Sequence, residues 1–307
     1  MSRARSRGEF IRADLAEVER LLERIPSTSV INRNSYLARK KELERELAEL
    51  REESVESFSF ELTFQGDPVE SDRGIVAKFG TEALKRFSDA VSQFAAASSS
   101  PLGSRGAVPN EEDYNLMITD VARGSFGFVL EAKWEMKDGT QTSPVVTAVA
   151  MIGRLINSAQ QDTDEGLADV AAGADPRAVN KLHEFLGLLA AQKATFAFQG
   201  DDMSFSCKNR DQVLRTEARL DINNIVERRE SLEGEFSGVL PHRGLFEFRK
   251  KDSEEFINGR IDERTVDAEM IKDMLDQTTT IEVRSTRAGK GQPRYLLLKV
   301  VQPPRLE

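Results

Sequence analysis

The chain has two histidines and one cysteine, the residue types that most often carry nucleophilic or acid–base catalysis. His183 lies beside Leu182 in a helical pattern, and His242 lies in a Pro-His-Arg-Gly turn, where exposure is the default. Cys207 ends a short apolar strand, where a thiol is usually buried and unreactive. A serine nucleophile would need a Gly-x-Ser-x-Gly turn, which the sequence lacks. We therefore expect no catalytic residues and no enzyme activity.

Acidic clusters could hold a divalent metal ion, and glycine-rich turns could cradle a phosphate. The acidic pair at 201–202 and the acidic triplet at 111–113 are such clusters. A chain with 52 acidic residues contains short clusters of this kind by chance. Residues 162–166 lack the ligand spacing and closing glutamate of a calcium loop, and residues 123–128 lack the lysine of a P-loop. We expect no metal and no cofactor. A divalent-metal-dependent hydrolase is the most remote of three functional hypotheses.

Five basic residues near the C-terminus could hold a nucleic-acid backbone, with aromatic rings nearby to stack bases. They are Arg243, Arg284, Arg287, Lys290 and Arg294. Residues 225–307 nevertheless contain 15 Lys and Arg against 16 Asp and Glu, without the basic excess typical of such domains. A nucleic-acid-binding accessory protein is therefore the alternative hypothesis and not the leading one.

These basic residues lie in the predicted loops of a small five-stranded β-barrel over residues 225–307. Apolar residues favour strands at 235–240, 245–248, 256–261, 278–283 and 295–301, with a helix capped by Thr265 between the third and fourth. Three strands, a helix and two strands is the element order of an OB fold. An SH3-like barrel is the competing topology, so the segment is predicted to be OB-like or SH3-like.

Residues 1–53 are predicted to form an antiparallel helical hairpin with a coiled-coil-like seam. The spacing of its apolar residues alternates between four and three, which is the spacing of a heptad repeat. The predicted interface residues are Ile11, Leu15, Val18, Leu22, Ile25, Leu43, Leu47 and Leu50. Such a stripe either packs against the same chain or pairs with a second copy or a protein partner.

Residues 54–224 are predicted to form a central α+β domain with an antiparallel sheet. Phe58, Phe60, Leu62 and Phe64 alternate with polar residues and predict a half-buried strand. Further strands are expected at 114–121, 126–134, 195–198 and 203–207, and helices are expected to begin near Thr81, near 143 and near 175. Residues 95–106 and 160–175 are rich in small or acidic residues and are predicted to be loops.

The composition of the whole chain is that of a soluble protein, with 39% hydrophobic and 31% charged residues. No signal peptide or transmembrane span is evident, and a single cysteine fits a reducing cytoplasm. The net charge of −9 argues against general affinity for nucleic acid or for membranes. The leading hypothesis is a cytoplasmic, non-enzymatic interaction or assembly protein, which oligomerises or binds a protein partner through its hairpin.

Overall fold

The computed structural model of the chain describes residues 11, 14–15, 17–22, 30–53, 55–100, 102–103, 106–122, 126–135, 143–161 and 163–301. These residues fall into two compact units, one within 1–58 and 133–141, the other within 59–132 and 142–307. The protein is mixed α+β, as predicted. The predicted division into residues 1–53, 54–224 and 225–307 stays a prediction. None of the helices so described combines the length and apolar character needed to cross a membrane.

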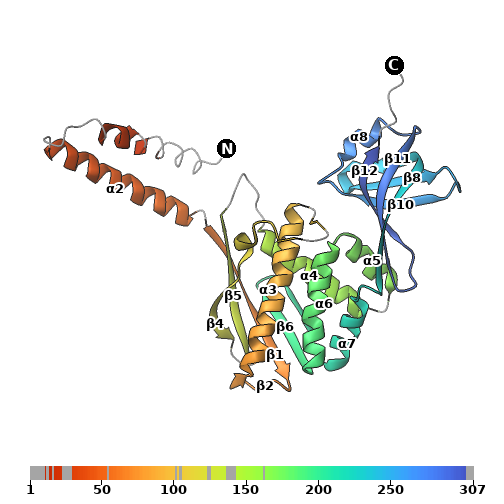
Figure 1. Cartoon of the computed structure of the whole chain (residues 1–307), viewed down its shortest axis with the longest axis horizontal. Helices are drawn as coiled ribbons and strands as arrows, with labels where there is room; N and C mark the ends of the chain where they lie inside the picture. The colour runs from red at the N-terminus through yellow and green to blue at the C-terminus, as the bar shows by residue number, and fades with distance from the viewer. Residues whose placement is uncertain are drawn as a thin grey trace. The chain divides into compact units, whose positions relative to one another are not determined.

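The first unit contains the long helix α2 (Val30–Glu53) and helical residues between positions 11 and 22 (Figure 1). A small apolar cluster forms between these segments, because the predicted seam residues face one another. Its buried members are Ile11, Val18 and Leu43, and Leu15, Leu22 and Tyr36 pack against them. Part of the predicted seam is therefore covered within this unit.

Two ion pairs also join the segments of the first unit. Arg39 Nη2 lies 2.8 Å from Asp14 Oδ2, and Lys40 Nζ lies 2.6 Å from Glu19 Oε1. The predicted seam residue Ile25 lies outside the described residues, as do the side chains of Leu47 and Leu50. The antiparallel hairpin as a whole therefore stays a prediction.

A five-stranded sheet forms the first part of the second unit, with its strands in the order β4-β5-β1-β6-β7. The strand pairs β4–β5, β1–β6 and β6–β7 are antiparallel. The strands are β1 (Val55–Gly66), β4 (Met117–Ala122), β5 (Phe126–Glu135), β6 (Ala194–Gly200) and β7 (Ser204–Cys207). A two-stranded ribbon, β2 (Val69–Glu70) and β3 (Gly74–Ile75), follows β1.

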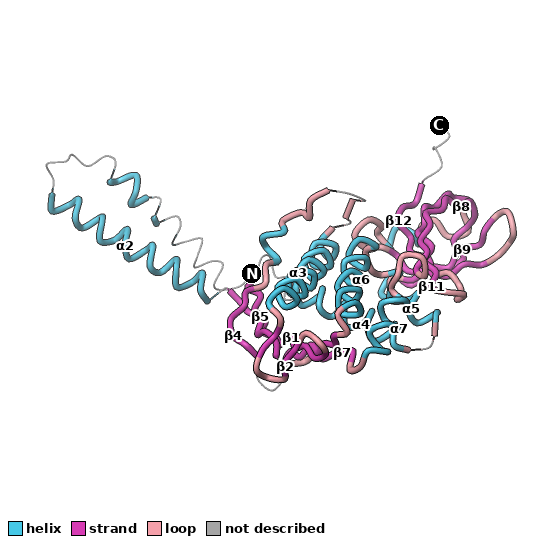
Figure 2. Tube along the Cα trace, turned by 60° about the horizontal axis from the view of Figure 1, so that its bottom comes forward, coloured by secondary structure: helices cyan, strands magenta, loops and turns pink. Residues whose placement is uncertain are grey.

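Helices cover one face of this sheet and make it a two-layer structure (Figures 1 and 2). The alternation predicted for β1 is present, since Phe60, Leu62 and Phe64 are buried while the intervening Ser59 and Glu61 are exposed. The helices of this unit are α3 (Ala77–Ser99), α4 (Pro144–Gln160), α5 (Asp164–Ala172), α6 (Pro176–Ala191) and α7 (Arg210–Arg219), with a 3₁₀ turn, η1 (Glu111–Tyr114).

Two segments predicted to be loops are helical in part. Helix α3 continues to Ser99 because its last turns carry alanines, which are buried and allow close packing. Helix α5 occupies most of the predicted connection at 160–175, and it buries Leu167 and Ala168. The predicted cap Thr81 is also wrong, because α3 begins at Ala77 and the Thr81 hydroxyl donates to the Ala77 carbonyl instead.

The C-terminal part of the second unit is a closed ring of five strands in the order β10-β12-β11-β8-β9. Strands β10 and β12 run parallel, whereas the other neighbours are antiparallel. The elements are β8 (Ile225–Leu240), η2 (Pro241–Arg243), β9 (Leu245–Lys250), β10 (Phe256–Ile261), α8 (Ala268–Lys272), β11 (Thr278–Ala288) and β12 (Arg294–Val301). The predicted order of three strands, a helix and two strands is present, although Asp267 and not Thr265 caps α8.

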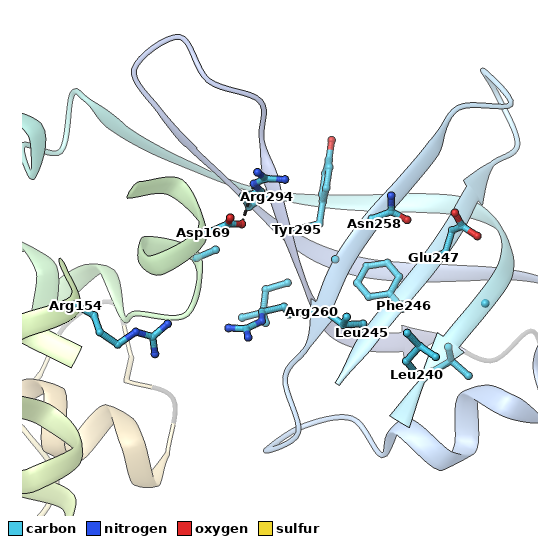
Figure 3. A pocket seen from close by; sticks show the side chains of 15 residues that line it. Arg154, Asp169, Leu240, Leu245, Phe246, Glu247, Asn258, Arg260, Arg294 and Tyr295 are labelled. Atoms are coloured by element: carbon cyan, nitrogen blue, oxygen red, sulfur yellow. Dashed lines mark ion pairs between the residues drawn. The ribbon is translucent and has the colours of Figure 1, made fainter. Parts of the chain in front are cut away.

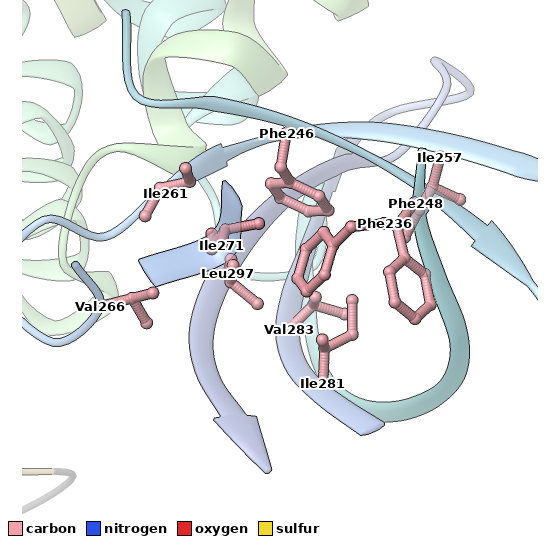
Figure 4. Close-up of a cluster of buried hydrophobic side chains, with 10 residues drawn as sticks. All are labelled: Phe236, Phe246, Phe248, Ile257, Ile261, Val266, Ile271, Ile281, Val283 and Leu297. Carbon is pink, nitrogen blue, oxygen red and sulfur yellow. The ribbon is translucent and has the colours of Figure 1, made fainter. Parts of the chain in front are cut away.

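The interior of the ring is filled by aromatic and branched side chains (Figure 4). The rings of Phe246 and Phe248 lie edge-on to the ring of Phe236, with centroids 6.1 and 5.2 Å away. Gly259 is required on β10, because a Cβ atom there would lie 2.5 Å from Phe246 Cε1 and 2.6 Å from the Tyr295 carbonyl oxygen. The inward positions are therefore filled by packed side chains.

Candidate functional site

A cleft of about 670 Å³ lies on the outer face of the strand ring, beside helices α4 and α5. Strands β8, β9, β10 and β12 form one wall, and Arg154 of α4 and Asp169 of α5 form the other (Figure 3). Its volume lies within the range of pockets that take small ligands. The outward-facing side chains of four strands therefore decide what the cleft can hold.

The strand register arranges these outward-facing side chains in two rows. In the first row, Leu240 pairs with Leu245, Leu245 pairs with Arg260, and Arg260 pairs with Leu296. Arg260 thus has a leucine as its direct neighbour on both adjacent strands. The row combines an apolar surface with a single cation.

The second row is polar and contains no cation. Gly238 of β8 pairs with Glu247 of β9, and Glu247 pairs with Asn258 of β10. The missing side chain at Gly238 leaves room beside the Glu247 carboxylate, whose oxygen would lie 3.8 Å from an added Cβ. This row offers hydrogen-bonding groups next to the apolar row.

Three guanidinium groups and two carboxylates line the cleft, and they are unequally paired. Arg294 Nε lies 2.9 Å from Asp169 Oδ1, so these two charges offset each other. Arg154 and Arg260 form no ion pair or hydrogen bond within the part of the chain that the structure describes. Their guanidinium groups extend from opposite walls toward the same space (Figure 3). The cleft can therefore attract an anion.

Tyr295 stands at the edge of the cleft with its ring partly buried. Burial raises the pKa of its hydroxyl, an effect that the charge of Lys250 partly offsets. The hydroxyl therefore stays protonated at neutral pH and can donate a hydrogen bond. Lys250 Nζ lies 5.9 Å from the ring centroid, so one face of the ring already has a cation near it.

A second hollow, of about 820 Å³, lies between the ring and the C-terminal ends of α3 and α5. Most of its arginines make hydrogen bonds or ion pairs within the protein. Arg264 pairs with Asp262, Arg284 Nη2 donates to the carbonyls of Ala172 and Ala174, and Arg177 donates to two loop carbonyls. Cations at helix C-termini are stabilising there, so this hollow is a structural junction.

The five basic residues predicted to bind nucleic acid occupy three kinds of position. Arg284 and Arg294 make the internal bonds described above, and Arg243 and Arg287 are exposed. The Lys290 side chain is exposed too, while its backbone N–H donates to Asp164 Oδ2 at 3.1 Å. The turn between β11 and β12 is thereby attached to the start of α5.

The catalytic candidates are dispersed. Cys207 is buried, and burial raises the pKa of its thiol despite hydrogen bonds with Thr216 and Gln160. His183 Nε2 lies 3.2 Å from Glu217 Oε1, and His242 is exposed in η2. Across the described ranges, no three His, Cys, Asp or Glu side chains gather as a metal-binding group. The acidic clusters at 111–113 and 201–202 are solvent-exposed.

Arg154 and Arg260 were not singled out by the sequence analysis. One signal was present, because Arg154 is the only charged residue in the otherwise apolar or neutral helix α4. Comparisons with protein-family models, curated proteins and solved structures found no match to this chain. A functional proposal therefore depends on the ring, its cleft and the helical unit.

Proposed function

We propose that this protein is a non-catalytic binding protein that holds single-stranded nucleic acid on the outer face of its strand ring. The proposal rests on the topology of the ring, which supports an OB fold over an SH3-like barrel. The first strand of the ring, β8, pairs with the second and the fourth, the third and fifth strands are parallel, and α8 lies between the third and fourth. OB folds bind oligonucleotides on the face of their second and third strands.

The cleft supports the same proposal because it opens on this face. The second and third strands are β9 and β10, and both line the cleft. Arg260 supplies a cation from β10 and Arg154 supplies one from α4, while Leu240 and Leu245 offer an apolar surface for bases. The site differs from the one the sequence suggested, because Arg284 and Arg294 already contact other residues of the protein, the carbonyls of Ala172 and Ala174 and the Asp169 carboxylate.

We predict salt-sensitive binding of a single-stranded oligonucleotide to the full chain. The net charge of −9 opposes association, so the cleft must supply a local attraction that counterion release makes strongest at low salt. Fluorescence anisotropy should show that Arg154→Gln and Arg260→Gln each weaken binding about tenfold or more, the loss expected for a charged hydrogen bond. Each change should also reduce the salt slope by about one.

Arg73→Gln is the matched control, because Arg73 is an exposed arginine in the turn between β2 and β3. It removes the same charge from the protein but lies outside the cleft lining. An absence of binding at low salt, or an equal loss in all three variants, would refute the proposal.

A second candidate function is assembly through the helical unit, with a second copy or with a protein partner. Ile11, Val18 and Leu43 form a buried cluster in this unit, which supports a stable helical pair. Leu37 of α2 remains 46% exposed and is an apolar side chain available to a partner. The proposed assembly function thus depends on Leu37, which lies next to the predicted seam, and not on the seam residues alone.

We predict that the full chain self-associates and that Leu37→Glu shifts it toward the monomer. A carboxylate at this position would have to be desolvated in any apolar interface, which is costly. Light scattering over a concentration series measures the effect. Leu214→Glu on α7 is the control, because Leu214 is also partly exposed. A wild-type chain that stays monomeric at every concentration would exclude self-assembly.

A further inference from the structure

We infer that the cleft recognises a terminal phosphate, the monoester group at the end of a nucleic-acid strand or on a free nucleotide. The inference rests on the proposed function and specifies which part of the ligand enters the cleft. It starts from the two guanidinium groups of Arg154 and Arg260, which face the same space without a carboxylate partner among the described residues (Figure 3).

The strand register explains why Arg260 has no partner. Its neighbours on β9 and β12 are Leu245 and Leu296, and the nearest carboxylate in the register, Glu247, pairs with Asn258 instead. Arg260 therefore has no carboxylate directly opposite it on either adjacent strand. Arg294, which also lines the cleft, is by contrast paired with Asp169.

The pair of guanidinium groups favours a phosphate monoester over a diester. Arg294 and Asp169 offset each other, which leaves two arginines and Glu247, whose carboxylate lies on the other row. A monoester carries a charge of about −1.5 to −2 at neutral pH, whereas a backbone diester carries a single charge. Guanidinium groups can also bind phosphate oxygens in pairs, so two arginines suit the three free oxygens of a monoester.

The shape of the cleft favours a ligand that ends there. The turn between β11 and β12 is attached to α5, since the Lys290 N–H donates to Asp164 and the Cβ of any side chain at Gly289 would lie 2.4 Å from Asp164 Oδ2. Helix α5 therefore occupies the side of the ring where the loop between the fourth and fifth strands would otherwise meet a passing strand. The volume of about 670 Å³ is enough for a nucleotide and small for a long strand.

The leucines beside Arg260 complete the site. Leu240 and Leu245 lie in the same row on β8 and β9, and Leu240 is exposed despite being apolar. An apolar surface next to a phosphate site matches a nucleotide, whose base is flat and whose phosphate is charged. The phosphate is assigned to the two arginines, and the base to the leucine surface.

The test compares one oligonucleotide in three forms, with a 5′-phosphate, with a 3′-phosphate and with hydroxyl groups at both ends, on the full chain by fluorescence anisotropy. We expect one phosphorylated form to bind about tenfold tighter or more than the hydroxyl form, as for a charge-assisted contact. That preference should disappear in Arg154→Gln and in Arg260→Gln and persist in Arg73→Gln. Thermal unfolding by circular dichroism establishes that the variants remain folded.

The outcomes separate the inference from the proposed function. Equal affinity for all three forms overturns the terminal phosphate and leaves single-strand binding intact. Binding of a nucleoside monophosphate without binding of any oligonucleotide supports the phosphate site and rejects single-stranded nucleic acid as the ligand. If neither the oligonucleotides nor the monophosphate bind, both fail.

Discussion

Replacing Phe185 with alanine is expected to lower the free energy of unfolding of the second unit by about 3–5 kcal/mol. Phe185 lies on α6 and is 0% exposed. Its ring centroid is 5.5 Å from that of Phe87 on α3 and 5.2 Å from that of Phe196 on β6. Truncation would remove aromatic contacts to α3 and to the sheet at once, and it would leave a cavity where the two layers meet.

Urea unfolding of the full chain, followed by circular dichroism, measures this loss. Leu214→Ala on α7 is the control, because Leu214 is 39% exposed and should cost no more than about 0.5 kcal/mol. A Phe185→Ala variant with the stability of the wild type would be incompatible with the packing of α6 against both α3 and β6.

Several elements of the fold followed from side-chain periodicity alone. Strand β1 was predictable because Phe60, Leu62 and Phe64 alternate with polar residues, and helices cover the face on which these three side chains are buried. The ring was predictable in element order because each of its strands contains apolar residues at alternate positions and turns such as 241–244 separate the strands. In both cases a local pattern and the tertiary environment require the same conformation.

Helix α5 shows why other elements were not predictable. Its residues are small or acidic, and such a composition also occurs in solvated connections. Its burial depends on β11 and β12, which lie more than a hundred residues later in the chain, and on bonds such as that from the Lys290 N–H to Asp164. A local pattern carries no information about a neighbour so distant in sequence.

The candidate site was missed for a related reason. The chemistry of an arginine depends on what the fold places beside it, and Arg284 and Arg260 are indistinguishable by type. Arg284 faces the carbonyl oxygens at the end of α5, whereas Arg260 faces a cleft between two leucines. The basic residues nearest the predicted turns were the candidates, and some of them, such as Arg284, hold the ring to the layered part of the same unit.

The largest electrostatic effect is expected at the junction between the ring and α3, for Arg264→Gln. Asp262 is only 6% exposed and accepts hydrogen bonds from Arg264 Nε at 2.7 Å and Nη2 at 2.9 Å. Arg264 Nη1 also donates to the Ala97 carbonyl at 2.5 Å. Removing one partner of a buried ion pair costs about 3–5 kcal/mol, and we expect about 2–3 kcal/mol here because the Arg264 side chain is 37% exposed.

The contribution of the Asp262 carboxyl group to the pH dependence of stability should change sign in Arg264→Gln. In the wild type, burial would raise the pKa of Asp262, but the hydrogen bonds and charge of Arg264 outweigh it and hold the pKa below its usual value. The folded pKa is thus lower than the unfolded one. The ionised carboxylate therefore contributes stability above the unfolded pKa, and this contribution is lost as the pH falls through the folded pKa.

In Arg264→Gln the burial of Asp262 is no longer offset by that guanidinium, so its folded pKa should rise above the unfolded value. The charged carboxylate then destabilises the fold at neutral pH, and protonation relieves the penalty as the pH falls through the raised pKa. Urea unfolding at neutral and mildly acidic pH should show a smaller difference from the wild type under acid conditions. The double variant Asp262→Asn/Arg264→Gln no longer contains the buried Asp262 carboxylate, so it should be more stable at neutral pH than Arg264→Gln alone. A penalty for Arg264→Gln that is independent of pH would show that Arg264 stabilises the junction through Ala97 and packing, and not through Asp262.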